Sequence, residues 1–156
     1  MARIEHLNNP NAPEPNSIVV AVTVFVQDEQ GRVLLIQRTD NGLWALPVGA
    51  QDFGEYIAET AVRETREETG IEIEVTGVVG IYTNPNHVVE YSDGEVRQQF
   101  SICFRGRYVD GQPTTSNESS AVRWVARRDL DGLAVHPSMR LRIEHGFEHR
   151  GEPYIG

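Results

Sequence analysis

The sequence contains no lysine and only one cysteine, Cys103, among its 156 residues. A single cysteine excludes a disulfide framework and a cysteine-rich zinc site. Cys103 lies within the apolar segment 100–104, so we expect it to be a buried strand residue. The sequence also lacks an apolar run long enough to cross a membrane and an apolar signal segment near its N-terminus. These absences favour a cytoplasmic protein.

Arginine supplies all 14 of the Lys/Arg positions, and the formal net charge is −9. The charge is uneven, because residues 1–96 carry 16 acidic residues and 5 arginines, whereas residues 97–156 carry 7 acidic residues and 9 arginines. The planar guanidinium group suits bidentate contacts with phosphate. The overall acidity argues against long nucleic acid as a partner, since no strongly basic patch is evident.

A chain of this length is expected to form one domain. We predict an Asn- and Pro-rich irregular arm over residues 1–16, a single domain over 17–150 and a short tail over 151–156. β-branched residues and alternation predict strands, and the helical spacing of apolar residues predicts a C-terminal helix at 137–149. The strands are expected at 18–27, 32–38, 72–82, 96–109 and 121–125, with a polar loop at 84–94 and a turn-rich loop at 111–120.

The most informative segment is 49–71, which reads GAQDFGEYIAETAVRETREETGI. At about 100° per residue, a helix here places Glu64, Glu67 and Glu68 close together at i, i+3 and i+4. Gly70 should end this helix. Clustered carboxylates repel each other unless a cation binds them, and oxygen-only ligands suit Mg²⁺ or Mn²⁺. The stripe expected to face the core is apolar or small and consists of Ala58, Ala61, Val62, Thr65 and Thr69.

This segment resembles the Nudix box, GX5EX7REUXEEXGU, in which U is a bulky aliphatic residue. The Trp-Ala-Leu-Pro sequence at 44–47 is also similar to the family. The resemblance implies a Nudix-type α/β fold: an α/β/α sandwich on a mixed sheet, with the box helix and a C-terminal helix. The box positions that match are Gly49, Glu55, Arg63, Glu64, Glu67, Glu68, Gly70 and Ile71.

Three positions depart from the family pattern. Val48 stands where the family usually has the first glycine of a Gly-Gly pair, and we expect its backbone to be extended, because a β-branched residue rarely adopts a positive φ. Thr65 replaces an aliphatic residue. Tyr56 replaces a frequent serine, so the side-chain N-cap of the box helix should be missing. None of these changes removes a carboxylate from the box.

The resemblance also implies roles for individual residues. Glu64, Glu67 and Glu68 are expected metal ligands, together with the carbonyl of Val48, which is a ligand in several family members. One of the three glutamates, or Glu118 from the later loop, is the expected general base. Other candidates are Arg63 for orienting the acids, Glu55 for either metal or loop contacts, and Arg38, Arg97 and Arg105 for substrate phosphates.

The resemblance implies a MutT-like pyrophosphohydrolase that uses Mg²⁺ or Mn²⁺. Its substrate would be a nucleoside diphosphate linked to another group, and both ADP-ribose and a nucleoside triphosphate stay open. Pro85 lies 14 residues after Ile71, and a proline at about this distance after the box resembles the ADP-ribose hydrolase subgroup. The alternative is a catalytically weak or inactive Nudix-fold module that has a nucleotide-binding or regulatory role. The expected partner is a small-molecule nucleotide, without long nucleic acid or membrane, and homodimerisation stays open.

Overall fold

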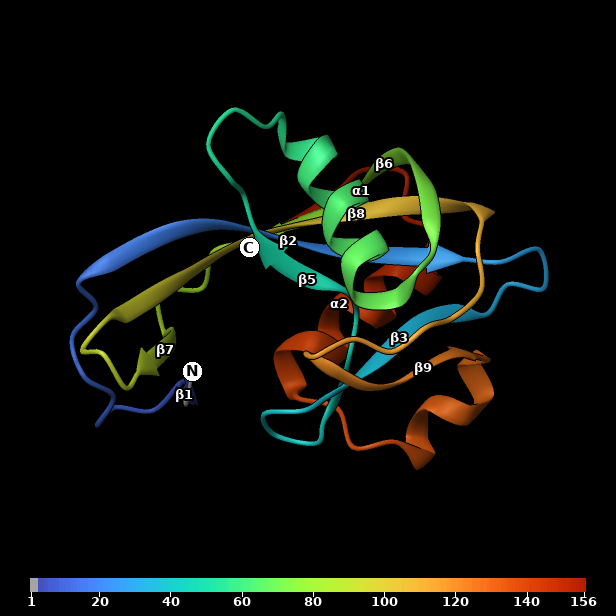
Figure 1. The fold of residues 1–156 in the computed structure, drawn as a ribbon. Coiled ribbons are helices and arrows are strands. Elements are labelled where there is room, and N and C mark those ends of the chain that lie inside the picture. The colour runs from blue at the N-terminus through green and yellow to red at the C-terminus, as the bar shows by residue number, and fades with distance from the viewer. Residues whose placement is uncertain (1–2) are drawn as a thin grey trace.

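The computed structural model describes residues 3–156, so the part of the expected arm at residues 1–2 lies outside the described residues. The chain forms one mixed sheet with two α-helices (Figure 1). In chain order the elements are β1 (Arg3–Leu7), β2 (Ser17–Gln27), β3 (Val33–Arg38), β4 (Trp44–Ala45), β5 (Val48–Ala50), α1 (Ile57–Thr69), β6 (Glu72–Tyr82), β7 (His87–Tyr91), β8 (Val96–Asp110), β9 (Ser119–Val125), the 3₁₀ helix η1 (Arg127–Gly132), α2 (Pro137–Glu148) and β10 (Tyr154–Ile155).

The centre of the sheet is the parallel pair β2 and β8, which are hydrogen-bonded from Ser17 opposite Arg97 to Gln27 opposite Arg107. The free edge of β8 pairs antiparallel with β6 along one half and with β7 along the other. The free edge of β2 pairs antiparallel with β5 and β3, and β3 continues the sheet to β9 and β4. β2 and β8 therefore lie inside the sheet, and their side chains on both faces of the sheet must be covered by other elements.

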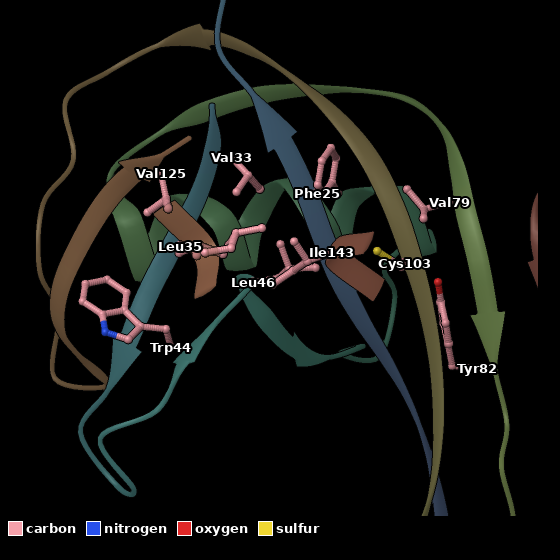
Figure 2. Packing of buried hydrophobic residues seen from close by; sticks show 11 residues of the cluster. Phe25, Val33, Leu35, Trp44, Leu46, Val79, Tyr82, Cys103, Val125 and Ile143 are labelled. Atoms are coloured by element: carbon pink, nitrogen blue, oxygen red, sulfur yellow. The ribbon is translucent and has the colours of Figure 1, made fainter. Parts of the chain in front are cut away.

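The two helices cover opposite faces of this sheet (Figure 1). Alternate side chains of β2, including Val22 and Val24, pack in the cluster that contains Ala61 of α1. The intervening residue Phe25 points to the other face, into the cluster that contains Ile143 of α2 (Figure 2). This confirms the predicted α/β/α sandwich. Among residues 3–156, no helix combines the length and apolar character that crossing a membrane requires.

Most of the predicted strands are confirmed within one or two residues. The predicted irregularity near Gly77 is also confirmed, because the pairing of β6 with β8 shifts register between Val75 and Gly77. Cys103 is fully buried, as expected from its apolar neighbours. The predicted C-terminal helix is present as α2, whose first turn begins with Pro137 and whose N-cap is His136.

Besides the short strands β4 and β5, which lie between the predicted strand at 32–38 and the box helix, three further short strands were not predicted. Residues 3–7 lie within the expected irregular arm, but they form β1 and pair antiparallel with β7. β7 itself lies within the expected polar loop at 84–94. Residues 154–155, in the expected tail, form β10 beside β6. These predictions were wrong because each of these strands is formed by pairing with a distant segment, which local composition does not reveal.

One close contact fixes the distance between α2 and the sheet. A Cβ added at Gly146 of α2 would lie 2.3 Å from Cδ2 of Phe25, a fully buried ring that also packs edge-on against Phe147. Real Cβ atoms do not approach a ring so closely. Position 146 therefore requires glycine, because the Phe25 ring leaves no room for a side chain.

We predict that Gly146→Ala destabilises the protein by about 1–3 kcal/mol, because the added methyl group overpacks the core. This sign opposes helix propensity, which favours alanine over glycine by roughly 0.5–1 kcal/mol. Chemical denaturation measures the difference. Gly132→Ala, where an added Cβ meets no atom within 4 Å, is the matched control. A stabilised Gly146→Ala protein would contradict the close packing of α2.

Candidate active site

The box helix α1 begins after Tyr56, which makes no side-chain capping hydrogen bond, as predicted. Its backbone N–H instead donates to the carboxylate of Glu59 at 2.8 Å. The helix ends at Gly70, whose φ of 74° is left-handed and whose N–H donates to the carbonyl of Arg66 at 2.9 Å. Glycine adopts this conformation without the steric cost that other residues meet.

The buried face of α1 is more polar than usual. Ala61, Thr65 and Thr69 are fully buried against the sheet, as predicted, while Ala58 and Val62 are half-buried. The Thr65 hydroxyl donates to the Ala61 carbonyl at 2.8 Å, and the Thr69 hydroxyl donates to the Thr65 carbonyl at 2.5 Å. Because each hydroxyl is hydrogen-bonded within the helix, threonine replaces the aliphatic residue without an unpaired buried donor.

Arg63 lies at the centre of the box. Its Nε and Nη2 donate to the two oxygens of Glu55 at 2.7 and 3.0 Å, and its Nη2 also donates to the Ala50 carbonyl at 3.1 Å. Its Nη1 donates to Glu64 at 2.8 Å and to Glu67 at 3.2 Å. The hydrogen bonds from Arg63 are the main cause that lowers the pKa of Glu55 to about 2. One guanidinium thus connects the loop before α1 to the acids on α1.

Gly49 leaves the space that the Glu64 carboxylate occupies. A Cβ added at Gly49 would lie 2.0 Å from Cδ of Glu64, so any larger residue would displace that carboxylate. Gly49 lies in β5, which pairs antiparallel with β2. The first glycine of the box is therefore required because a strand and a helix carboxylate approach each other closely.

Glu68 is the most buried acid of the cluster, with 3% of its surface exposed. Burial, together with the neighbouring charges of Glu64 and Glu118, raises its pKa to about 9. A hydrogen bond from the Val48 N–H, at 3.2 Å, acts in the opposite direction. Burial likewise raises the pKa of Glu64. The cluster therefore holds more negative charge than its surroundings stabilise.

The backbone at Val48 is extended, as predicted. Val48 is the first residue of β5 and pairs with Thr23 of β2. Among residues 3–156, the non-glycine residues with positive φ are Asn8 and His149. The position has therefore adapted to a β-branched residue without backbone strain.

A single pocket collects the acids, and we call it the acid pocket. Glu118, in the loop before β9, also lines it. This loop is anchored, because the Ser119 hydroxyl donates to the Glu68 carbonyl at 2.9 Å and the Thr39 N–H donates to the Glu118 carbonyl at 3.1 Å. The lining residues are Val48, Gly49, Ala50, Glu64, Glu67, Glu68, Ser116, Asn117 and Glu118.

Two of the three candidate phosphate-binding arginines lie beside the acid pocket. Arg38 and Arg97 line an adjoining pocket that shares Val48 and Glu118 with it. Each is held by a carboxylate, Arg38 by Asp40 at 2.8 and 2.9 Å and Arg97 by Glu95 at 2.9 Å.

Arg105 lies elsewhere, contrary to its selection as a phosphate contact. Its Nη2 donates to the Gly146 carbonyl at 3.1 Å, and its guanidinium lies over the Phe25 ring. It shares a face of β8 with Arg97, but it lies farther along the strand, where α2 covers that face. Strand alternation predicts the face of a side chain, whereas it does not predict which part of the face is open.

A third pocket adjoins the other two, and we call it the inner pocket. It shares Arg38 and Val48 with the pocket that contains Arg97. Several of its polar residues were not singled out from the sequence, namely Glu5, His87, Gln99, Ser101, His136 and Arg142. The alternation of the strand at 96–109 places Gln99 and Ser101 on one face, but no sequence signal connects them to the other four.

Comparisons with known proteins bear on the family of this chain. The family model described as "NUDIX domain" matches residues 18–145. The chain belongs to the Nudix family. A "MutT-like protein" of Streptomyces ambofaciens is 36% identical over 114 residues, which cover 73% of this chain and 68% of that protein. An "ADP-ribose pyrophosphatase" of Methanocaldococcus jannaschii is 39% identical over 123 residues, which cover 74% and 66% of the two chains.

The fold of this Nudix chain matches solved structures. The crystal structure of an ADP-ribose pyrophosphatase from Streptococcus suis superimposes with a TM-score of 0.70 and covers 88% of this chain and 98% of that one. The two sequences are 21% identical, so this likeness concerns the fold alone.

The acid pocket of this Nudix protein fits a divalent cation by its chemistry. Its carboxylates offer oxygen donors, and burial raises the pKa of Glu64 and Glu68, so positive charge would stabilise their ionised forms. Within residues 3–156, no three His, Cys, Asp or Glu side chains already stand at metal-binding geometry. Glu64 and Glu67 are turned toward Arg63, and Glu68 toward the Val48 N–H. Binding a cation therefore requires these carboxylates to exchange partners.

We predict that Val48→Gly destabilises the protein by about 0.5–1 kcal/mol, because glycine in a strand loses more backbone freedom on folding. The melting temperature and chemical denaturation of the purified variant measure this. If the backbone at Val48 were strained, the same substitution would instead raise the melting temperature. That result would contradict the extended conformation of β5.

Proposed function

We propose that this chain hydrolyses the pyrophosphate bond of a nucleoside diphosphate linked to another group, and that it does so with Mg²⁺ or Mn²⁺. The observation that carries the proposal is the convergence of Glu64, Glu67, Glu68 and Glu118 on one pocket beside two arginines. Membership of its family makes the chain a Nudix pyrophosphohydrolase. Nudix hydrolases generally use divalent metal ions.

In this proposal Glu64, Glu67 and Glu68 hold the metal, together with the carbonyl of Val48. A bound divalent metal supplies charge neutralisation for the phosphates and acidifies an attacking water. Arg63 orients the acids, because it already contacts Glu64 and Glu67. Glu55 has a positioning role, since both of its oxygens are occupied by Arg63.

Glu118 is the proposed general base. It lines the acid pocket together with the three box glutamates but comes from a different element, so it can accept a proton without giving up a metal ligand. The hydrogen bonds of Thr39 and Ser119 to the backbone of this loop and of α1 hold it in place. A carboxylate held within reach of water is a suitable base for this step.

Arg38 and Arg97 are the proposed phosphate contacts. Both line the pocket that adjoins the acids, and both present guanidinium forks suited to phosphate oxygens. Their present partners, Asp40 and Glu95, hold them in position.

The proposed substrates are ADP-ribose and nucleoside triphosphates. ADP-ribose is favoured by the name of the Methanocaldococcus jannaschii relative, which is 39% identical over 123 residues. The MutT-like relative keeps nucleoside triphosphates in consideration. Purified protein incubated with a panel of both substrate classes, with Mg²⁺, Mn²⁺ or EDTA, tests the proposal. Release of a nucleotide product that EDTA abolishes is the expected result, and the absence of metal-dependent cleavage across the panel would refute it.

We predict that Glu68→Gln lowers kcat/KM by at least about 100-fold, since loss of one such electrostatic group costs roughly 2.7–4 kcal/mol of transition-state stabilisation. The fold should stay intact, because glutamine has the same shape as the glutamate side chain and, like its protonated form, carries no charge. Glu59→Gln is the control, since Glu59 lies on the same helix but contacts the Tyr56 N–H. Near-wild-type turnover of Glu68→Gln at saturating Mg²⁺ would exclude Glu68 as a metal ligand.

We predict that Gly49→Ala lowers kcat/KM by about 100-fold with little change in melting temperature. The added methyl group displaces the Glu64 carboxylate, and a misplacement of about 1 Å in an active site can cost that much rate. Stability should change little, because the clash involves the far end of a flexible side chain. Gly77→Ala, where an added Cβ meets no atom within 4 Å, is the control. Equal activity of the two variants would contradict this account of Gly49.

A further inference from the structure

The inner pocket has features that the acid pocket does not require. It lies where β8, the first turn of α2 and the β1–β7 pair meet. Val48 lines both the inner pocket and the acid pocket, so the two adjoin at this residue. A substrate whose pyrophosphate lies at the acids can therefore extend one of its ends into the inner pocket.

The inner pocket contains a buried arginine without a carboxylate partner. Arg142 of α2 is 4% exposed, and among residues 3–156 no acidic oxygen lies within ion-pair distance of it. Its Nη1 donates to the Ser138 carbonyl at 2.6 Å, and its guanidinium lies 4.5 Å from the centre of the Tyr82 ring. Its Nε has no hydrogen-bond partner within the described chain. A buried charge with an unused donor is costly unless a ligand compensates it.

A second unpaired group lines the same pocket. Ser101 of β8 is 5% exposed, and its hydroxyl has no hydrogen-bond partner in residues 3–156. Buried polar groups are usually hydrogen-bonded, so each exception needs an explanation. Arg142 and Ser101 come from different elements and line one pocket. Both have unpaired donors, which points to a ligand with an oxygen that accepts hydrogen bonds.

The other walls of the inner pocket limit what this ligand can be. Glu5 does not neutralise Arg142, because its carboxylate accepts from His87 at 2.6 Å and pairs with Arg3 at 3.5 Å. Trp44, Leu43 and Met139 supply apolar surface. A pocket with apolar walls and oxygen-seeking donors suits a flat or ring-shaped end group that carries an oxygen acceptor.

We infer that the inner pocket holds the end group of the substrate and that Arg142 and Ser101 select an end group with an acceptor oxygen. This inference rests on the proposed function, since it assigns one end of the same substrate. The acceptor oxygen has two sources, the carbonyl of a keto nucleobase or an oxygen of a terminal sugar. Adenine carries no exocyclic oxygen, so an adenine nucleotide without a second sugar lacks the selected group.

Binding of uncleavable analogues to the full chain with Mg²⁺ tests this inference. The probes are analogues of GDP, ADP-ribose and ADP in which a methylene group replaces the bridging pyrophosphate oxygen, measured by isothermal titration calorimetry. Arg142→Met should weaken the GDP or the ADP-ribose analogue by about tenfold or more, as for a hydrogen bond from a charged donor. Ser101→Ala should weaken the same analogue by about three- to tenfold. The analogue that responds identifies the source of the oxygen, and binding of the ADP analogue should not change.

Ser101→Ala and one control variant make the test independent of folding defects. Arg142→Met removes the bond to the Ser138 carbonyl, whereas Ser101→Ala removes a hydroxyl that has no partner in the described chain, so its fold should be unaffected. Arg105→Met is the matched control, because Arg105 also donates to an α2 carbonyl but does not line the inner pocket. Unchanged binding of all three analogues by Ser101→Ala and Arg142→Met would overturn the inference, as would an equal loss for the ADP analogue. Failure of hydrolysis alone would refute the proposed function without affecting these binding results.

Discussion

The ion pairs of Arg63 connect the parts of the candidate active site more directly than any other interaction. This guanidinium contacts Glu55 in the loop before α1, the Ala50 carbonyl at the end of β5, and Glu64 and Glu67 on α1. Exposed ion pairs stabilise proteins only slightly, but networks of several charges hold geometry better than isolated pairs do. The value of Arg63 is therefore positional. It sets the acids at the mouth of a pocket in which their mutual repulsion is only partly balanced.

The sheet provides the second constraint on these acids. β5 is short, but its pairing with the buried residues Val22 and Thr23 of β2 holds Val48 and Gly49 in place. The Val48 N–H reaches Glu68, and the missing side chain of Gly49 admits Glu64. The short strand β5 thus positions two carboxylates in two ways. The Val48 N–H donates to one, and the lack of a side chain at Gly49 leaves room for the other. Valine is tolerated at 48 because the first of these ways uses only the backbone.

Much of this architecture could be predicted from the sequence, because the information was local. The box segment predicted the helix, its glycine end and the cluster of Glu64, Glu67 and Glu68 from spacing alone. Glu118 was found from its place in a polar loop before a strand. Arg105 and the strands β1, β7 and β10 were not predicted correctly, because each depends on a distant partner. The inner pocket could not be predicted at all, since its residues come from segments far apart in the chain, among them β1, β2, β3, β7, β8 and α2.

The same long-range pairing explains how one acidic chain can present two opposite electrostatic environments to a single ligand. The box helix concentrates carboxylates at one end of the connected pockets, where a metal would reverse the local charge. The C-terminal half, which is richer in arginine, supplies Arg97 and Arg142 farther along. The β1–β7 pair closes the inner end and brings Arg3 and Glu5 to it. In the proposed function the acids bind a cation, and in the further inference the buried guanidinium binds an acceptor. The two ends of the adjoining pockets would then be complementary to different parts of a nucleotide.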